Sequence, residues 1–473
     1  MKQTIRKLLP IGILQRYHQS LAIISKVVYG MPSEKMIVVG VTGTNGKSTT
    51  VILIAKILEE AGHKVGATST AIFKIGQKEW LNDKKMTMLG RFALQRLLRD
   101  MTTAGCQYAV IETSSEGIKQ YRHLGVHYDI GVFTNLTPEH IESHGSFANY
   151  KEAKLKLFRK IAKDPPKKIM NWIPDQVRDD NGVKKVFVVN GDDEHTDDFL
   201  NYKVNEKIIF KIQDTRKQET RSNCFTSLAN RGGQANKFQA IISNLQNLVA
   251  QNIQLNSNGV SFKVDGTDFN LKLFGQFNIY NALAAIAVAK SQGIDLEVCK
   301  LALEKVDSVP GRMEFIETQK DFKVLVDYAP EPESIAQLYQ TIKGHNISPG
   351  KIIHVLGSCG GGRDKSRRPI LGKLAAGNAD IVIVTDEDPY DEDPMEIISQ
   401  VAKGAQDAGK KPEENLFIIL DRRKAIQKAL SLAQAEDLVL LTGKGCEQAI
   451  CVANGHKIPW DERKVAQEEL DKL

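Results

Sequence analysis

Between residues 35 and 62 an apolar run, a glycine-rich loop and a helical pattern follow one another directly. The β-branched run KMIVVGV (35–41) predicts a buried strand, and STTVILIAKILEEAG (48–62) has helical spacing and ends at a glycine. The loop between them, GVTGTNGKSTT (40–50), nearly fits the phosphate-loop pattern G-x-x-x-x-G-K-[ST]. The first glycine of that pattern would fall on Val41, however, and glycines stand at positions 40 and 43 instead.

A phosphate cradle needs backbone N–H groups, a helix N-terminus and a lysine, and it does not need one fixed glycine spacing. Lys47 is placed to reach the β- and γ-phosphates of a nucleotide, and Ser48 to ligate Mg²⁺. The alternative is a plain glycine turn before a helix. We favour the cradle, because chance seldom places Gly-Lys-Ser-Thr after a strand pattern.

The chain continues with the alternation of an α/β protein. QYAVIET (107–113) and YDIGVFTNL (128–136) predict buried strands that end in polar residues, and 146–162 and 277–293 predict helices. Alternating runs within 186–273 predict further strands. Residues 163–185 break all periodicity, and we expect a surface insertion there; NWIPDQVRDDNG weakly resembles translated bacterial repeat elements.

Pro310 and Gly311 lie where the sequence changes from a helical to a strand pattern, and they predict a domain junction there. Beyond them, five apolar runs separated by helical stretches predict a second open sheet. The expected fold class is α/β, with a P-loop central domain on a mostly parallel sheet and a C-terminal Rossmann-like α/β domain. The expected boundaries are 1–35 for a short helical segment, 36–308 for the central domain and 309–473 for the C-terminal domain.

Composition narrows the class of protein. With 42% hydrophobic and 26% charged residues among 473, the chain is neither disordered nor a membrane bundle. The net charge of +7 is not concentrated in a basic stripe with aromatic residues, so the sequence gives no sign of nucleic-acid binding. The six cysteines include no C-x-x-C pair, so we expect neither a zinc ribbon nor a disulfide framework. The apolar runs of the first 30 residues are interrupted and no cleavage site follows. We expect a cytoplasmic protein with a docked N-terminal helix, membrane-surface contact being the alternative.

Ten motifs, taken in order, resemble the Mur ligases, ATP-dependent enzymes that add amino acids to peptidoglycan precursors. They match the third-residue-adding, MurE-type branch, which extends UDP-N-acetylmuramoyl-L-alanyl-D-glutamate, and the resemblance covers roughly 36–465. The motifs are GVTGTNGKST (40–49), IETSSEGIKQYR (111–122), VFTNLTPEH (132–140), YKEAKLKLF (150–158), FGQFNIYNALAA (274–285), PGRME (310–314), VDYAPEPES (326–334), GGGRDKSRRP (360–369), TDEDPYDEDP (385–394) and LTGKGCEQ (441–448).

The resemblance implies an acyl-phosphate mechanism that uses ATP and Mg²⁺. It implies catalytic roles for Lys47, Glu112, His140 and Lys154, with Ser48, Glu112, His140 and a CO₂-carbamylated Lys154 as metal ligands. Without the resemblance, Lys154 would be interpreted as a surface lysine and His140 as a structural histidine. The ATP-binding residues implied are Gly43, Thr44, Asn45, Gly46, Lys47, Ser48, Thr49, Asn278, Asn281, Arg312 and Asp327.

The resemblance also implies two substrate sites, one for a nucleotide-sugar peptide acceptor and one for an amino acid. From composition we expect no nucleic-acid partner and no stable membrane insertion. We expect a monomer, although the sequence does not determine the oligomeric state. The implied acceptor-binding residues are Thr87, Ser114, Gln120 and Arg122. The implied amino-acid-binding residues are Arg363, Asp388, Tyr390, Gly443 and Glu447.

Four positions depart from the branch pattern. Only 39 residues precede Gly40, fewer than the usual UDP-binding domain needs, so UDP recognition is an open question. Glu116 and Pro330 stand where the branch has histidines, and Tyr390 stands where diaminopimelate enzymes have arginine. Tyr390 cannot make the bidentate pair of an arginine with a distal carboxylate, so we expect diaminopimelate to be a poor substrate.

The acidic residues around Tyr390 (387, 388 and 391–393) favour an amine-ended side chain such as lysine, a solvated acidic loop being the alternative. Two other functions stay open. A Mur-like ligase of the folylpolyglutamate-synthetase type would share the core and lack the UDP domain. A non-catalytic nucleotide-binding scaffold would have no need of a second set of metal ligands.

Overall fold

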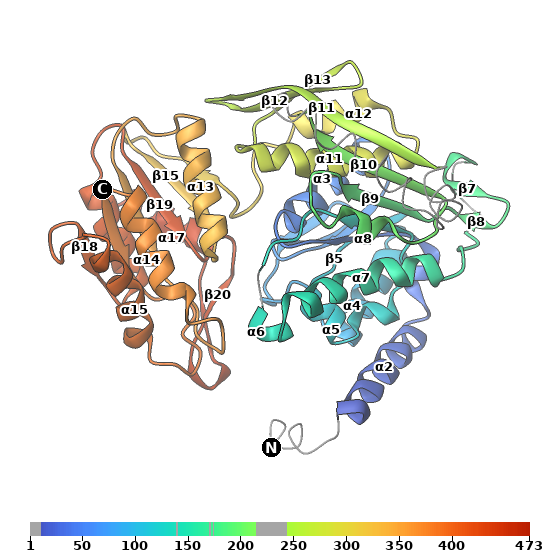
Figure 1. Cartoon of the computed structure of the whole chain (residues 1–473), viewed down its shortest axis with the longest axis horizontal. Helices are drawn as coiled ribbons and strands as arrows, with labels where there is room; N and C mark the ends of the chain where they lie inside the picture. The colour runs from blue at the N-terminus through green and yellow to red at the C-terminus, as the bar shows by residue number, and fades with distance from the viewer. Residues whose placement is uncertain (1–10, 139–140, 170–171, 174, 214–243) are drawn as a thin grey trace, which may run out of the picture.

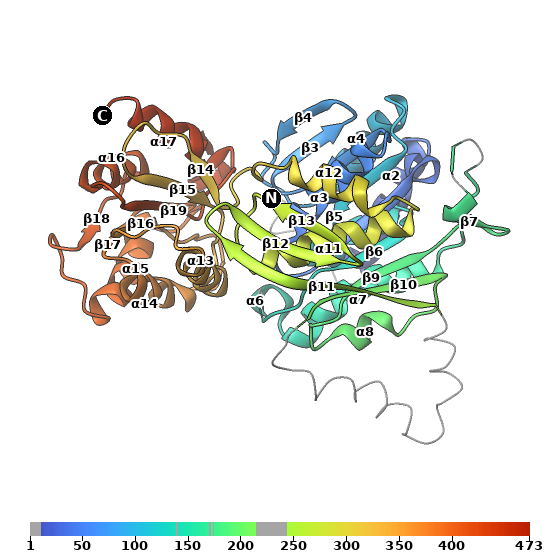
Figure 2. The ribbon, with the colours of Figure 1, turned by 90° about the horizontal axis from the view of Figure 1, so that it is seen from above.

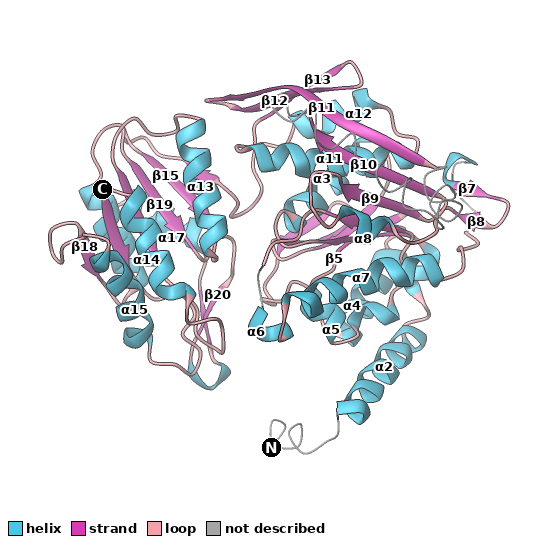
Figure 3. Ribbon diagram, viewed as in Figure 1, coloured by secondary structure: helices cyan, strands magenta, loops and turns pink. Residues whose placement is uncertain are grey.

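The computed structural model describes residues 11–138, 141–169, 172–173, 175–213 and 244–473. Two β-sheets, each with helices on both faces, lie side by side (Figure 1). The first is built from the N-terminal two-thirds of the chain and the second from the C-terminal third, as the colours of Figure 1 show. Figure 3 marks the helices and strands of both. The predicted α/β class, with two sheet domains, is confirmed.

The large sheet contains eleven strands in the described part of the chain. Its strands from β11 to β2 run parallel, and antiparallel hairpins extend both edges. In spatial order the strands are β13 (Thr267–Leu271), β12 (Gly259–Val264), β11 (Leu245–Asn256), β10 (Glu206–Ile212), β9 (Val186–Asn190), β6 (Ile130–Phe133), β1 (Ile37–Thr42), β5 (Tyr108–Glu112), β2 (Val65–Thr68), β3 (Ile72–Ile75) and β4 (Lys78–Leu81).

Strand β1 is buried on both faces, as its unbroken apolar run predicts. Ile37, Val39 and Val41 pack toward one helical layer, and Val38 toward the other. The first layer is α3 (Lys47–Glu60), α11 (Gln276–Ser291) and α12 (Leu296–Glu304). The second layer is α4 (Arg91–Thr103), α5 (Ser115–Lys119), α7 (Phe147–Lys163) and α8 (Thr196–Leu200), which lie below the sheet in Figure 1. Figure 2 looks down on the first layer from above.

Gly40, the first of the two oddly spaced glycines, lies within β1. A Cβ at this position would lie 2.8 Å from the ring of Tyr128 and 3.3 Å from Leu157. The missing side chain therefore serves close packing between the sheet and α7. The departure from the usual phosphate-loop spacing begins inside the strand, before the loop itself.

Helix α2 (Ile11–Val28) packs against α4 and the 3₁₀ turn η2 (Arg122–Gly125), and η1 (Pro32–Lys35) connects it to β1. It buries Ala22 and Ser25, while Ile24 and Val28 on other faces are half exposed or more. The predicted docking of this helix is confirmed over part of its surface. Within the residues that the structure describes, none of the helices combines the length and apolar character needed to cross a bilayer.

The segment 163–185, which we expected to be a surface insertion, is only partly so. It contains η3 (Asp175–Val177) and a small hairpin of β7 (Arg178–Asp179) and β8 (Gly182–Val183). Val177 and Val183 are buried in the core under α11, and Lys167 makes a buried ion pair with Asp129 at 2.5 Å. The lack of periodicity arose because single apolar residues, rather than a helical or strand face, anchor the segment.

The second sheet contains six strands among the described residues, parallel except at one edge. All five predicted apolar runs form strands. In spatial order the six strands are β14 (Glu314–Ile316), which was not among the predicted runs, β15 (Lys323–Asp327), β19 (Leu438–Thr442), β16 (Ile352–Leu356), β17 (Ile381–Val384) and β18 (Leu416–Ile418).

Five helices cover this sheet on its two faces. One face carries α13 (Pro332–Gly344), α14 (Arg367–Asn378) and α15 (Pro394–Asp407), and the other carries α16 (Arg422–Leu432) and α17 (Glu462–Leu470). A separate hairpin of β20 (Ala449–Cys451) and β21 (Lys457–Pro459), joined through η4 (Ala453–Gly455), extends toward the first domain (Figure 1).

Candidate active site

A cavity of about 1250 Å³ lies between the two sheets. On one side it is lined by residues at or just after the carboxyl ends of β1, β5 and β6, namely Gly43, Glu112 and Thr134. On the other side it is lined by Asp327 and Gly443, from the ends of β15 and β19. Ligands of open α/β sheets gather at such strand ends, so the cavity is the natural site for chemistry.

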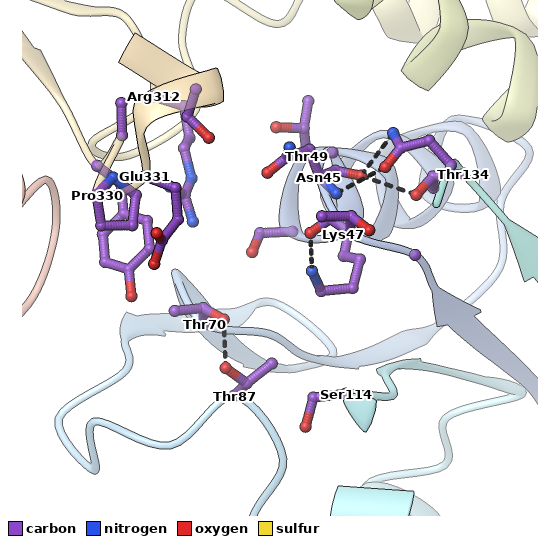
Figure 4. Close-up of a pocket in the computed structure, with 18 of the residues that line it drawn as sticks. Asn45, Lys47, Thr49, Thr70, Thr87, Ser114, Thr134, Arg312, Pro330 and Glu331 are labelled. Carbon is purple, nitrogen blue, oxygen red and sulfur yellow. Dashed lines mark hydrogen bonds between the residues drawn. The ribbon is translucent and has the colours of Figure 1, made fainter. Parts of the chain in front are cut away.

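The glycine-rich loop after β1 is fixed to the end of β6. The backbone N–H groups of Thr44 and Asn45 donate to the main-chain and side-chain oxygens of Asn135, at 2.9 and 2.8 Å. The Thr134 hydroxyl donates to the Asn45 carbonyl at 2.7 Å (Figure 4). The loop is therefore held in one shape, and helix α3 begins within it with its N-terminal N–H groups at the cavity.

Gly46 caps α3 in the left-handed region, with φ at 80°. A Cβ there would lie 2.2 Å from Oδ1 of Asn281 on α11, so only glycine fits both the backbone angle and the contact. Lys47, the first residue of α3, folds its ammonium back onto the Thr44 carbonyl at 2.6 Å. This places the lysine across the loop, beside the space that a phosphate would enter (Figure 4).

Ser48 and Glu112 form a buried pair on the floor of the cavity. The Ser48 hydroxyl donates to Oε2 of Glu112 at 2.7 Å, and Glu112 is only 2% exposed. The other donors to this carboxylate among the described residues are the Thr70 N–H at 2.7 Å and the Thr70 hydroxyl at 3.2 Å. All these donors are neutral, and oxygen ligands of this kind suit Mg²⁺, so the donor set fits a divalent cation.

Lys154 lies 1% exposed on α7, so it is no surface lysine. Its ammonium donates to the Gly43 carbonyl at 2.6 Å and lies 4.3 Å from the centre of the Tyr150 ring. It therefore touches the phosphate loop from the side opposite α3. In this unmodified form it is a hydrogen-bond donor and cannot ligate a metal.

His140, predicted as a second metal ligand, lies outside the described residues. Among the residues that are described, no cluster of three or more histidine, cysteine or acidic side chains gathers in a metal-binding arrangement. Of the four predicted metal ligands, the structure therefore describes Ser48, Glu112 and Lys154, and the Ser48–Glu112 pair supplies the oxygen ligands.

Two asparagines of α11 line the cavity near the loop. The Asn281 amide donates to Oδ1 of Asn278 at 2.8 Å and accepts from the Thr50 hydroxyl at 3.2 Å. The Asn278 amide donates to the Phe274 carbonyl at 2.7 Å. Both side chains are thus oriented by the protein itself, and they join α3 to α11 at the cavity wall.

Arg312 approaches the phosphate loop from the C-terminal domain (Figure 4). Its guanidinium lies 4.2 Å from the centre of the Tyr328 ring. Asp327, at the end of β15, accepts hydrogen bonds from the N–H groups of Met313 and Ala329, both at 2.7 Å, and so shapes the segment that carries Arg312. Burial raises the pKa of Asp327, although Arg312 opposes the shift.

The predicted acceptor residues form one wall of the first domain. A hydrogen bond of 3.0 Å between the Thr70 and Thr87 hydroxyls joins Thr87 to the Glu112 network (Figure 4). Ser114 caps α5 by accepting from the Gly117 N–H at 3.2 Å. Arg122 donates to Gln120 at 2.7 Å and to the Met88 carbonyl, and its buried Nε has no hydrogen-bond partner in the described chain.

The opposite end of the cavity carries two carboxylates and two lysines. Asp388 pairs with Lys85 at 2.6 Å and with Lys444 at 3.0 Å, and Glu447 pairs with the same two ammoniums at 3.0 and 2.8 Å. We call these four side chains the lysine–carboxylate cluster. Lys85 comes from the first domain and the other three from the second, so the cluster crosses between the domains.

The acidic stretch 387–393 is paired in part with basic residues of the chain, so the preference for an amine-ended side chain stays a prediction. Glu392 pairs with Arg368 at 2.9 Å and Lys365 at 3.0 Å, and Asp393 caps α15. Glu387 accepts a hydrogen bond from the Cys359 thiol, and its charge is felt by Arg367 and Arg422. The carboxylates are visible in the sequence as one cluster. Their basic partners are far away in the chain, so the sequence did not reveal them.

Tyr390 lines the cavity next to this cluster with φ at 53°, an uncommon angle for a non-glycine residue. Its N–H donates to the Cys451 carbonyl at 3.0 Å, which ties the loop to β20. Burial raises the pKa of the Tyr390 phenol, so the ring is neutral at physiological pH.

Family comparison assigns both halves of the chain. Residues 41–289 match the Mur ligase middle domain, and residues 311–445 match the Mur ligase, glutamate ligase domain. The chain belongs to the Mur ligase family. It is therefore an ATP-dependent amide ligase. This excludes the alternative of a non-catalytic nucleotide-binding scaffold.

Two relatives illustrate the similarity to the MurE type. The chain is 37% identical over 465 residues to a UDP-N-acetylmuramyl-tripeptide synthetase of Roseiflexus sp. (strain RS-1), covering 96% of this chain and 82% of the relative. It is 32% identical over 461 residues to a UDP-N-acetylmuramoyl-L-alanyl-D-glutamate--2,6-diaminopimelate ligase of Clostridium tetani (strain Massachusetts / E88), again covering 96% and 82%.

Solved structures repeat this pattern. A UDP-N-acetylmuramoyl-L-alanyl-D-glutamate--2,6-diaminopimelate ligase matches with a TM-score of 0.57 at 25% identity, over 97% of this chain and 83% of that one. A Mycobacterium tuberculosis folylpolyglutamate synthase complexed with ADP and AMPPCP has a TM-score of 0.61 but 14% identity, over 90% and 92%, so the likeness is one of fold alone.

The cavity of this Mur ligase brings together nearly all the predicted site residues. Gln120 does not line it and acts on Arg122 instead, and His140 is outside the described chain. The predicted residues that line the cavity are Gly43, Thr44, Asn45, Gly46, Lys47, Ser48, Thr49, Thr87, Glu112, Ser114, Arg122, Lys154, Asn278, Asn281, Arg312, Asp327, Arg363, Asp388, Tyr390, Gly443 and Glu447.

Three residues of this Mur ligase escaped the sequence reasoning. Thr70 bridges Glu112 and Thr87, and Lys85 and Lys444 pair with the carboxylates of the opposite end. Lys444 could have been found, because it stands between Gly443 and Glu447 in the motif LTGKGCEQ. Thr70 and Lys85 could not be found in this way, because each lies in a loop outside the ten motifs.

Proposed function

We propose that the chain joins an amino acid to UDP-N-acetylmuramoyl-L-alanyl-D-glutamate, with ATP as the energy source. The printed names of its relatives support this reaction. The observation that carries it is the single cavity, in which the phosphate loop, the Ser48–Glu112 pair and the lysine–carboxylate cluster face one another. Such a cavity can hold a nucleotide, a carboxylate acceptor and an amine at once.

The reaction needs an activated carboxylate, because a carboxylate and an amine do not form an amide unaided at neutral pH. A carboxylate oxygen of the acceptor attacks the γ-phosphorus of ATP, and the bond from that phosphorus to the bridging oxygen breaks, releasing ADP. The amine then attacks the acyl carbon of the acyl phosphate, loses a proton and expels inorganic phosphate. Positioning and charge neutralisation supply most of the catalysis of phosphoryl transfer.

Lys47 and the N-terminus of α3 are the groups of this chain that meet phosphate charge. The ammonium of Lys47 rests on the Thr44 carbonyl at 2.6 Å, and a small rotation of its flexible stem turns it toward a bound phosphate. Arg312 faces the same loop from the second domain (Figure 4). The two cations thus stand on opposite sides of the space for the nucleotide.

Ser48 and Glu112 are the residues that would hold Mg²⁺. The pair is buried and its donors are neutral, so a divalent cation would balance the Glu112 charge. When bound, Mg²⁺ neutralises charge on the phosphoryl oxygens. Thr70 holds the carboxylate in place through both its N–H and its hydroxyl.

We further propose that Lys154 is carbamylated in the active enzyme and that His140 ligates a second cation. Burial of Lys154 against the phosphate loop supports a role at the site rather than at the surface. Carbamylation replaces a cation by a carboxylate-like anion, which could approach a metal that an ammonium would repel.

The acceptor wall is proposed to be Thr87, Ser114 and Arg122. The buried Nε of Arg122 has no partner among the described residues, and an acceptor carboxylate or phosphate would supply one. Burial, together with the charge of Arg91, lowers the pKa of Arg122, and an anion would relieve both effects.

Three broader features remain proposals. The domain boundary at residues 308 and 309 falls between α12 and β14, where the chain passes from one sheet to the other. A monomer suffices, because one chain contributes both walls of the cavity. A cytoplasmic location is expected of a ligase that consumes ATP.

The test is ADP release with UDP-N-acetylmuramoyl-L-alanyl-D-glutamate or dihydrofolate as acceptor, across a panel of amino acids. We expect turnover with the muramoyl acceptor, and Lys47→Ala should abolish most of it. If only dihydrofolate supported turnover, the proposed acceptor would be wrong and the enzyme would be a ligase of the folylpolyglutamate-synthetase type. Full activity of Lys47→Ala would contradict the phosphate-loop role.

A further inference from the structure

Asp388 and Glu447, two of the residues that the family resemblance implies for the incoming amino acid, already hold a cation from the chain itself. The ammonium of Lys85 contacts both carboxylate oxygens of Asp388, at 2.6 and 2.8 Å, the carboxylate of Glu447 at 3.0 Å and the Ala449 carbonyl at 2.8 Å. Its side chain is 6% exposed. Four oxygen contacts and near-complete burial are what a bound substrate ammonium would receive.

The loop that presents Lys85 is held in one conformation. The Asn82 amide donates to the carbonyls of Ser69 and Met86, at 2.7 and 3.0 Å, and its oxygen accepts from the Lys84 N–H at 2.9 Å. Lys85 itself has φ at 52°, a left-handed angle that is costly for a residue with a side chain. This strained backbone conformation directs the Lys85 side chain toward Asp388 and Glu447 of the second domain.

The charges of the lysine–carboxylate cluster cancel. Burial lowers the pKa of Lys85, but Glu447 and Asp388 outweigh it, so the pKa lies well above its ordinary value. Burial raises the pKa of Asp388, but Lys444 and Lys85 outweigh it, so this pKa lies below its ordinary value. The pKa of Lys444 is likewise raised overall by Glu447 and Asp388 against burial.

A ligand ammonium entering this cluster would therefore meet two ammoniums whose charge already balances the carboxylates. It would have to displace Lys85 or share its partners, and either course leaves a buried charge badly paired. A side chain without charge meets no such penalty.

We propose that Lys85 is a specificity-determining residue, an internal cation that makes the ligase select against amino acids with a side-chain ammonium. The proposal rests on the proposed ligase function and takes the lysine–carboxylate cluster as the subsite for the side chain of the amino acid. It assigns an uncharged side chain to the substrate, against the basic one that the acidic loop alone would favour.

A purely structural role for Lys85 makes a different prediction. If Lys85 only held the two domains together, its loss would slow the enzyme equally for every amino acid. Selectivity between two amino acids of the same shape separates the two roles. L-lysine and L-norleucine form such a pair, because norleucine has the same carbon chain and lacks the ammonium.

The experiment measures kcat/KM for L-lysine and L-norleucine in the wild type, in Lys85→Met and in Lys84→Met. Lys84 is the matched control, since it is adjacent, 58% exposed and paired only with Asp83 among the described side chains. We expect Lys85→Met to raise the lysine-to-norleucine ratio about tenfold or more, and Lys84→Met to leave it within about twofold. An unchanged ratio in Lys85→Met, or a wild type that already prefers lysine about tenfold, would overturn the proposal.

Equilibrium binding of the same two amino acids is measured by calorimetry, together with Lys85→Arg. This readout does not need turnover, so a protein that binds norleucine but releases no ADP would count against the proposed function while still testing Lys85. Lys85→Arg keeps the charge and should keep the wild-type binding ratio. A ratio in Lys85→Arg that matches Lys85→Met would show that charge is not the cause and would reject the proposal.

Discussion

The two ends of the cavity bury acidic side chains in opposite ways. At the phosphate end, Glu112 is 2% exposed and the hydrogen bonds it accepts from described residues come from neutral groups. At the end that carries the lysine–carboxylate cluster, which we propose takes the amino acid and call the amino-acid end, Asp388 is 3% exposed and pairs with two lysines of the same chain. A buried carboxylate without a cation is costly, so the first end is suited to receive a metal, whereas the second end already has its cations.

The largest expected effect breaks the phosphate end. Glu112→Gln keeps the shape of the side chain and removes the charge that would hold Mg²⁺, and losing one such preorganised group costs on the order of 10²–10³ in rate. The check is steady-state ADP release across a range of Mg²⁺ concentrations. Glu116→Gln is the control, because Glu116 lines the same cavity but accepts from Gln120 and Ser143 instead. Equal losses in both variants would contradict a metal role for Glu112.

The next effect concerns Lys154. We expect Lys154→Ala to lose about 10² in rate, and a short carboxylate in solution to restore part of it, because the carbamate is the group that would be missing. Labelled CO₂ followed by carbon NMR reports the modification without reference to activity. Lys151→Ala, on the same helix and paired with Asp198 at 2.8 Å, should stay near wild type. A fully active enzyme whose Lys154 remains a free amine when CO₂ is excluded would disprove the carbamate.

A smaller effect tests the amino-acid end from a second side. Tyr390→Arg places a guanidinium at the cavity wall, where it could pair with the distal carboxylate of meso-diaminopimelate. We expect wild type to use this amino acid poorly and the variant to use it about tenfold better, since each tenfold corresponds to about 1.4 kcal/mol. Competition assays at saturating ATP and acceptor measure the change. No gain in the variant would show that position 390 does not select the substrate.

The last effect is on stability rather than on activity, and it sharpens the comparison of buried charges. Burial raises the pKa of Asp386 to about 6, above its ordinary 3.8, so the folded state binds the proton more tightly than the unfolded state. Stability should therefore fall as pH rises from about 4 to about 6 and then level off. Asp386→Asn keeps an oxygen for the Glu387 N–H and removes this loss, which is about 3 kcal/mol at pH 7 for a pKa raised from 3.8 to about 6.

Urea unfolding of wild type and Asp386→Asn at pH 4 and pH 7 measures that difference. The gain in the variant should be present at pH 7 and small at pH 4. A gain of the same size at both pH values would point to packing rather than ionisation.

The sequence predicted the elements that rest on local pattern. The run 35–41 forms β1, the helical spacing of 48–62 forms α3, and all five apolar runs of the C-terminal domain form strands. Motif spacing likewise placed Lys47, Ser48 and Glu112, because the ends of neighbouring parallel strands must meet at one edge of a sheet. The segment 163–185 was less predictable, since it is anchored by isolated contacts such as Lys167 with Asp129.

What the sequence by itself determined is the phosphate end of this Mur ligase, where loop, strand end and helix start are contiguous or adjacent in one sheet. Only the tertiary structure decided the charge of the amino-acid end. Lys85 and Asp388 are far apart in the chain and belong to different domains, yet their side chains lie 2.6 Å apart. The physical reason is that electrostatic balance depends on distance in space, and a list of acidic residues carries no information about the cations that fold against them.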